Sequence, residues 1–260
     1  MHRLELCIED IRRWMKKNFL KLNDSKTEFL VLGGKKDLEK VKISHVRVGD
    51  TEILASTCAR NIGAYFDDSM DMKDQVAHTI RSCYSQIRSI SKIRKYLNID
   101  SAKKLVHAFV SSRLDNLNSL LINLPDCQLN RLQKIQNSAA RLVTKKKRSC
   151  HITPVLKELH WLPVEYRIKY KLLLLVYKCL CDNGPIYLKS LLVPYQPKKN
   201  LRSAEQFQLK VSRVAKVYGS RAFAVAGPQL WNKLPVDIKN CATVSSFKAK
   251  IKTHLFEMHF

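Results

Sequence analysis

The chain has 260 residues, of which 45% are hydrophobic, and its 47 Lys and Arg outnumber 22 Asp and Glu, giving a formal net charge of +25. This composition argues against a disordered tail and allows one large domain or two smaller ones. Because such a charge excess repels itself, we expect a polyanionic partner. Nucleic acid is the first candidate for this partner, and an anionic membrane surface is the second. The simplest alternative is a soluble basic protein without such a partner.

The N-terminal part predicts one helix and several short strands. Apolar side chains recur at helical spacing over residues 3–18, namely Leu4, Ile8, Ile11 and Met15. A β-rich run follows from Thr27 to Leu32, and residues 41–53 alternate like a hairpin that turns at Gly49-Asp50. One more strand is expected from about Thr57 to Phe66.

After Ser69 the patterns become helical. Long helices are expected over roughly 70–96, 100–122, 127–144 and 163–182. The clearest buried face is the stripe Leu129, Leu132, Ile135, Ala139, Leu142 and Val143. A linker is then marked by Pro185, Pro194 and Pro197. The last segment, about 200–260, combines a short strand "FQLKV" with a final helix "VSSFKAKIKTHLF", so the whole chain predicts an α+β fold.

The cysteines and the apolar runs indicate the compartment. The eight cysteines show no Cys-x-x-Cys pair, so we expect free thiols in a reducing compartment and no metal ligands. The most apolar run, Leu172 to Tyr177, is too short to span a bilayer, and the first residues lack the apolar region of a signal peptide. A nuclear or cytoplasmic protein without membrane insertion is therefore expected.

The stretch Tyr65-Phe66-Asp67-Asp68 spells Tyr-x-Asp-Asp, the metal-binding signature of reverse transcriptases. Adjacent residues on a strand face opposite sides, so Asp67 and Asp68 do not converge on one metal without a special turn. Two-metal phosphoryl transfer also needs a further carboxylate that holds ions about 4 Å apart. The stretch Asp68-Ser69-Met70-Asp71 instead resembles a capping box, with Asp71 and Asp74 in the first helical turn. We therefore favour a helix start over a catalytic pair.

Several longer stretches resemble one family, the reverse transcriptases of LINE-type (non-long-terminal-repeat, jockey-like) retrotransposons. "WMKKNFLKLNDSKTEFLVLG" resembles the end of their palm. "LQKIQNSAARLV", "HITPVLKELHWLPVEYRIKYK", "GPIYLKSLL", "GPQLWNKLP" and "FKAKIKTHLF" resemble their C-terminal region. The resemblance runs in order from about Leu4 to Phe256, and "LHWLPVEYRIKYK" is its most specific block. One departure is Asn116-Leu117, where Tyr-Cys is expected.

The resemblance implies a truncated palm of a helix and short antiparallel strands over 1–68, a helical thumb over 69–145, and a helical or mixed C-terminal region over 146–260. The intact family is an RNA-directed DNA polymerase that uses paired Mg²⁺, and its Tyr-x-Asp-Asp box would fall before Met1. We therefore expect no catalytic residue and no cofactor in this chain, only backbone binding of an RNA–DNA hybrid or other nucleic acid. The alternatives are a host-retained, non-catalytic nucleic-acid-binding or interaction protein, and an inert pseudogene product.

Eleven basic residues are candidates for phosphate contacts. By resemblance, Lys26 would lie near the phosphates of the incoming nucleotide in an intact enzyme, and a solvated lysine is the alternative. The other candidates are Arg88, Lys92, Lys95, Arg131, Lys134, Arg141, Lys145, Lys146, Lys147 and Arg148. Residues 88, 92 and 95, like 131 and 134, recur at spacings that share a helical face. The run 145–148 suits phosphate contact or nuclear import, and a solvated loop is the simpler alternative.

Two tryptophans and one histidine lie in the C-terminal region of the chain. Trp161 and Trp231 are each flanked by leucine and followed closely by proline. Aromatic rings can stack on bases, but buried anchors at element boundaries are the commoner use of such residues. We therefore expect both rings to be buried, and we expect His160 to be structural rather than catalytic.

Overall fold

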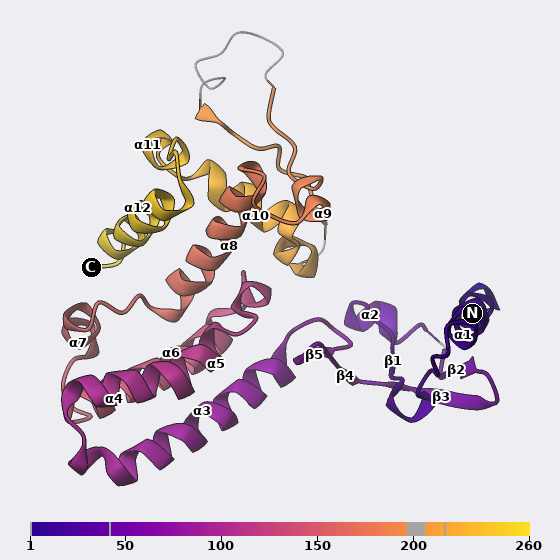
Figure 1. The fold of residues 1–260 in the computed structure, drawn as a ribbon, viewed down its shortest axis with the longest axis horizontal. Helices are drawn as coiled ribbons and strands as arrows, with labels where there is room; N and C mark the ends of the chain where they lie inside the picture. The colour runs from indigo at the N-terminus through magenta and orange to yellow at the C-terminus, as the bar shows by residue number, and fades with distance from the viewer. Residues whose placement is uncertain (1, 42, 197–205, 216) are drawn as a thin grey trace. The chain divides into compact units, whose positions relative to one another are not determined.

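The computed structural model describes residues 2–41, 43–196, 206–215 and 217–260 (Figure 1). The chain divides into two compact units, Met1–Ala77 and His78–Phe260. All strands longer than a single bridge, among the described residues, lie in the first unit, and the second unit is built from helices. The expected mixed α and β class is thus observed.

Unit 1 contains two small sheets. In chain order its elements are α1 (His2–Lys17), η1 (Asp24–Lys26), β1 (Phe29–Leu30), α2 (Lys35–Leu38), β2 (His45–Val48), β3 (Thr51–Ser56), β4 (Cys58–Asn61), β5 (Ala64–Asp67) and the start of α3 (Lys73–Ile93). The first sheet has the order β1-β3-β2, and β4 pairs with β5 in the second. The expectation of antiparallel strands is wrong for β1, which runs parallel to β3. The chain passes through α2 and β2 between them, and such a crossover returns a strand in the same direction.

The hairpin predicted over residues 41–53 is confirmed as β2 and β3. The strands are antiparallel, with Val46 opposite Ile53 and Val48 opposite Thr51. Val46 and Val48 are 3% and 1% exposed, so the inward face of β2 is part of the core. Gly49 at the turn has φ +62°, a left-handed conformation in which glycine carries no steric penalty.

The single strand predicted from about Thr57 to Phe66 is wrong, because the chain folds there into a second hairpin. β4 and β5 pair antiparallel, with Asn61 opposite Ala64. Ile62 and Gly63 form the two-residue turn, with φ values of 47° and 84°. Two successive positive φ angles match the twist of antiparallel strands, and Gly63 makes the turn possible.

The helix predicted over 3–18 is confirmed as α1, but its apolar stripe is only partly covered. Leu4 and Ile11 are 43% and 48% exposed, whereas Ile8 and Met15 are half-buried. The strand packed against α1 is β2, whose four residues are too few to cover a helix of 16. The N-terminal helix therefore leaves an apolar surface within unit 1.

Unit 2 contains most of the helices. After α3 come η2 (Arg94–Tyr96), α4 (Ile99–Val106), η3 (His107–Ser111), α5 (Ser112–Asp115), η4 (Asn118–Leu121), α6 (Asp126–Thr144), α7 (Ile152–Glu158), α8 (Val164–Leu180), α9 (Ile186–Lys189), η6 (Val217–Arg221), α10 (Phe223–Asn232), α11 (Val236–Lys239) and α12 (Val244–Glu257). The helices predicted over 127–144, 163–182 and 244–256 are confirmed as α6, α8 and α12. In the predicted stripe of α6, Leu132, Ile135, Ala139 and Val143 are buried.

The helix predicted over 100–122 is interrupted. Between α4 and α5 the backbone forms a π-helical segment, η3. The helix then ends at Asp115, and Leu117 takes a left-handed φ of 55° before η4 begins. A π-segment widens the helical turn and breaks the 3.6-residue pattern, so apolar periodicity alone did not reveal these interruptions.

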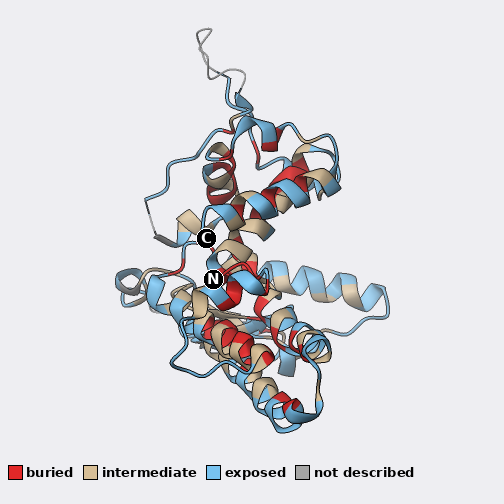
Figure 2. Cartoon of the chain, turned by 90° about the vertical axis from the view of Figure 1, so that its left-hand side faces the viewer, coloured by how far each residue is buried: buried red, intermediate tan, exposed pale blue. Residues whose placement is uncertain are grey.

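The core of unit 2 joins α8, α10 and α12 through aromatic rings. Tyr177 and Phe247 stack with centroids 4.1 Å apart and planes at 8°. The hydroxyl of Tyr177 donates to the carbonyl of Cys241 at 2.5 Å, and the indole N–H of Trp231 donates to the carbonyl of Phe207 at 2.8 Å. Trp231 and Trp161 are 2% and 5% exposed, which confirms the prediction that both rings are buried. Figure 2 marks buried residues in red, and several helices carry them on one side only.

The strand predicted at "FQLKV" is wrong, because Leu209 makes only an isolated bridge to Pro194. The side-chain amide of Asn232 accepts from the Leu209 amide and donates to the Leu209 carbonyl, both at 2.8 Å. A side chain therefore occupies the backbone groups that a neighbouring strand would use. Pro185 precedes α9, whereas Pro197 lies outside the described residues. No helix in the described part of the chain is long and apolar enough to cross a membrane.

Candidate nucleic-acid interface

The Tyr-x-Asp-Asp stretch ends β5 and leads into α3. Asp67 is 6% exposed, and its Oδ1 accepts from the Asp71 amide at 2.5 Å and from the Ser69 hydroxyl at 3.2 Å. Its Oδ2 accepts from the Lys73 amide at 2.9 Å. Both oxygens of this carboxylate are thus engaged by the start of the helix. Among the described residues, no cluster of His, Cys, Asp or Glu is arranged to hold a metal ion.

The expected helix start is confirmed, but the residue that caps it is Asp67, so the proposed capping box on Asp68 is wrong. Asp68 contributes its backbone instead: its amide donates to the Thr57 carbonyl and its carbonyl accepts from Gly33, both at 3.0 Å. Asp67 is the buried last residue of β5, and its carboxylate meets the unpaired amides at the start of α3.

Lys26 lies at the end of η1 with its side chain exposed. It lines an open depression of about 470 Å³ together with Glu28, Arg60 and Phe66. In the part of the chain that the structure describes, its ammonium makes no hydrogen bond or ion pair. The role of Lys26 near nucleotide phosphates stays a prediction.

The outer face of α6 carries Arg131, Lys134 and Arg141. At 100° per residue these three positions fall within a sector of about 80°, and they extend over about 15 Å of helix. The face that carries Leu132, Ala139 and Val143, which lies away from these three residues, is buried. The helix therefore presents one basic ridge to the outside.

The charges of this ridge are not neutralised by ion pairs within the described residues. Arg131 donates to the side-chain carbonyl of Gln128 at 2.8 Å, and no partner is described for the ammonium of Lys134. Arg141 is half-buried and donates to the Cys150 carbonyl at 3.2 Å, which fastens the loop that follows α6. Arg131 and Lys134 are thus more accessible to a ligand than Arg141.

Arg94, which was not among the predicted site residues, joins the ends of α3 and α6. The residue is 8% exposed, and its guanidinium donates to the carbonyls of Leu142 at 2.8 Å, Val143 at 2.6 Å and Leu97 at 2.6 Å. Two of these carbonyls belong to the last turn of α6, where a cation satisfies orphan acceptors and complements the helix dipole. In sequence Arg94 is one more charge in a basic series, so only its burial distinguishes it.

The consequence of this cap is a gathering of basic side chains at one end of unit 2. Lys95 follows Arg94 directly, and Lys145, which ends α6 with φ 56°, follows Val143 by two residues. The predicted residues of this region are all exposed: Arg88, Lys92, Lys95, Lys145, Lys146, Lys147 and Arg148. None of them takes part in an ion pair within the described residues. We call these seven residues the basic end.

Tyr96 is a second residue that the sequence patterns did not single out. Its ring is 76% exposed, and the Lys95 ammonium lies over it at 4.8 Å from the centroid. An exposed aromatic ring beside uncompensated cations can stack on a base while the cations contact phosphates. The signal available in the sequence was the adjacency of Tyr96 to Arg94 and Lys95 at a helix end.

Comparison of the chain with protein-family models, curated proteins and solved structures found no match. Its functional reading therefore rests on the arrangement of its own side chains. Arg131 and Lys134 on α6 and the seven residues of the basic end are exposed cations, and Tyr96 adds an exposed aromatic ring beside Lys95. Such a surface has the charge and the donor chemistry to hold phosphate groups.

Proposed function

We propose that this protein binds nucleic acid through the phosphate backbone, with little sequence preference. The observation that carries the proposal is the basic end, where Arg94 gathers the ends of two helices and seven exposed cations have no described carboxylate partner. Neutralising phosphates with lysine and arginine releases condensed counterions, which favours binding to any sequence. Partners with exposed backbone include an RNA–DNA hybrid and single strands of RNA or DNA.

Salt-dependent binding tests this proposal. We expect the affinity for an RNA–DNA hybrid to fall linearly with salt on logarithmic axes, with little change between unrelated sequences. Replacing Lys145, Lys146, Lys147 and Arg148 by Gln should flatten the slope by about 0.9 for each phosphate contact that is lost. A matched control replaces four exposed lysines of unit 1, at positions 16, 17, 21 and 40, by Gln. Equal slopes for the two quadruple variants would refute the assignment of binding to the basic end.

The ordered family resemblance supports a more specific proposal, that the chain is a C-terminal part of a LINE-type reverse transcriptase. In that proposal unit 2 includes the thumb, and this chain lacks polymerase activity because it lacks the family's catalytic box. The Tyr65–Asp68 stretch does not replace that box, since Asp67 caps a helix. A primer-extension assay with added Mg²⁺ should give no templated product. Templated synthesis by this chain would overturn the proposal.

The alternatives of a host-retained binding protein and an inert product lead to different measurements. Both non-catalytic binding proposals require a steep salt dependence, and its absence would leave the inert product. Reading the transcript upstream of Met1 in frame separates the polymerase fragment from the host-retained binding protein. An uninterrupted catalytic box there supports the polymerase fragment. A nuclear or cytoplasmic location is part of the proposal, with residues 145–148 as the import signal.

A further inference from the structure

A cavity of about 430 Å³ opens in unit 2 where several helices converge. Its walls come from η3, α5, η4, the segment before α8, α8 itself and α12. None of the ridge or basic-end residues lines it. A volume of this size is in the range of cavities that hold one small organic ligand.

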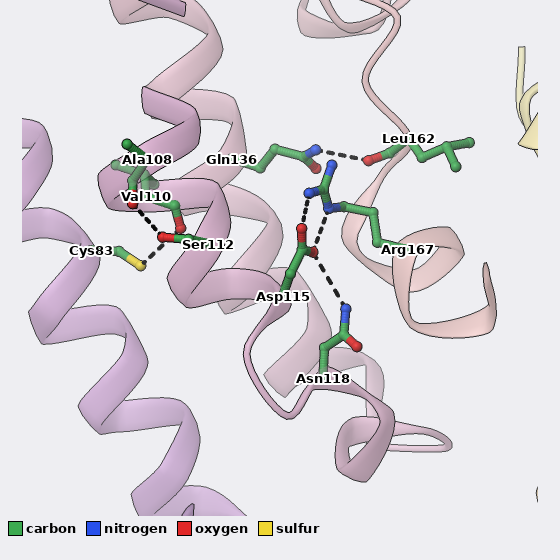
Figure 3. Close-up of polar contacts among 9 residues, drawn as sticks. All are labelled: Cys83, Ala108, Val110, Ser112, Asp115, Asn118, Gln136, Leu162 and Arg167. Carbon is green, nitrogen blue, oxygen red and sulfur yellow. Dashed lines mark hydrogen bonds and ion pairs between the residues drawn. The ribbon is translucent and has the colours of Figure 1, made fainter. Parts of the chain in front are cut away.

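One wall of the cavity is a polar network in which Arg167 and Asp115 are half-buried and Asn118 is buried. The guanidinium of Arg167 binds the carboxylate of Asp115 through two hydrogen bonds, with Nε to Oδ1 at 2.8 Å (Figure 3). Asn118 donates to the same carboxylate at 3.4 Å and is itself 3% exposed. Its Oδ1 is buried and accepts no hydrogen bond from the described residues. A buried acceptor of this kind has an unfilled hydrogen-bonding requirement.

The charge of the cavity is positive. Arg167 and Asp115 neutralise each other, whereas Lys171 and Lys252 line the cavity without a described ion-pair partner. Both lysines are exposed, one on α8 and the other on α12. The cavity therefore combines a polar wall without net charge with two lysines, from different helices, that have no described ion-pair partner.

The remaining wall is aromatic. His107, Trp161 and Tyr170 line it, and the rings of His107 and Trp161 meet edge-on with centroids 5.4 Å apart. His107 begins the π-helical segment η3, and such segments occur frequently at functional sites. The Cys83 thiol supports this segment by donating to the Val110 carbonyl at 3.8 Å, as Figure 3 shows.

We propose that this cavity binds one unstacked nucleotide of a nucleic-acid strand, with its base against the aromatic wall and its phosphate held by Lys171 and Lys252. An inorganic anion would use only the two lysines, and an acidic peptide would leave the aromatic wall without a partner. The choice of ligand class rests on the proposed function, but the site shares no residue with the basic end.

Calorimetric titration of the full chain with AMP, ribose 5-phosphate and inorganic phosphate tests the proposal. We expect AMP to bind at least tenfold more tightly than the other two, because only AMP carries a base. Substitution of Lys171→Gln together with Lys252→Gln should weaken AMP binding at least tenfold. The control Lys233→Gln with Lys248→Gln removes two exposed charges outside the cavity and should leave AMP binding unchanged. Equal binding of AMP and phosphate, no binding of AMP, or equal loss in both double variants would overturn the proposal.

Two further experiments complete the test. The first distinguishes binding in the cavity from binding at the basic end, and the second distinguishes a nucleic-acid strand from a free nucleotide as the ligand. The quadruple Gln variant of residues 145–148 should bind AMP as tightly as the unmodified protein does. If backbone binding at the basic end fails, the AMP titration therefore still tests the cavity. An oligonucleotide with one unpaired terminal adenosine should displace AMP, and its failure to do so would overturn the assignment to a strand.

The NMR resonance of the His107 ring provides a signal specific to this site. The pKa of His107 is lowered by partial burial and by the charges of Arg167, Lys103 and Lys252, while Asp115 acts in the opposite direction. A phosphate bound in the cavity should therefore raise the pKa of His107.

Discussion

Replacing Arg94 by Met should destabilise unit 2 more than the loss of any exposed cation at its basic end. Met keeps an unbranched apolar stem but removes the donors to the carbonyls of Leu142, Val143 and Leu97. A hydrogen bond from a charged donor contributes about 1.5–3 kcal/mol to stability. Because water can reach some of the released helix-end carbonyls, we expect a net loss of about 3 kcal/mol rather than the full sum.

Urea unfolding followed by the helical circular dichroism signal measures this loss. With an m-value of about 2–3 kcal/mol per molar urea, a loss of about 3 kcal/mol lowers the midpoint by about 1 M. The control Lys95→Met removes the same charge from the neighbouring exposed position and should change stability by less than about 0.5 kcal/mol. Equal midpoints for the two variants would refute the assignment of Arg94 as the cap that joins α3 to α6.

Two further predictions concern Asp67 and His107. Asp67→Ala removes the acceptor of the Asp71 and Lys73 amides and should lower the free energy of unfolding, measured by urea titration, by about 2 kcal/mol. The control Asp68→Ala leaves the backbone hydrogen bonds of that residue in place and should lower it much less. The pKa of His107 is lowered from 6.5, so the folded state binds fewer protons than the unfolded state, and stability should rise with pH below about 6.5 and level off above it. His107→Gln should reduce that dependence, and an unchanged pH profile would contradict it.

Local patterns in the sequence predicted those elements whose structure is decided locally. The turn at Gly49-Asp50 follows from its residue types, and the buried face of α6 follows from helical periodicity. The second hairpin was missed because Ile62 supplies one of the two positive φ angles, and a β-branched residue gives no turn signal. The π-segment at His107 was missed because it preserves helical composition while it changes the backbone hydrogen bonding.

The candidate interface divides in the same way. Spacing predicted that Arg131 and Lys134 share a helical face, and helix geometry agrees. Spacing could not distinguish Arg94 from Lys95, because their different roles depend on α6, a helix nearly 50 residues away in sequence. The cavity beside Trp161 was equally out of reach, since its two lysines come from α8 and α12 and meet only in three dimensions.

The cap formed by Asp67 also limits what mutation can make of this chain. The carboxylate of Asp67 already accepts three hydrogen bonds at the start of the helix and keeps little lone-pair capacity for a cation, so helix capping and metal binding compete at position 67. Asn and Ser each offer one side-chain oxygen where the carboxylate offers two, so either substitution should preserve only part of this cap. Helix capping thus accounts for Asp67 in the Tyr-x-Asp-Asp stretch, but it does not call for the side chain of Asp68, whose described hydrogen bonds come from its backbone.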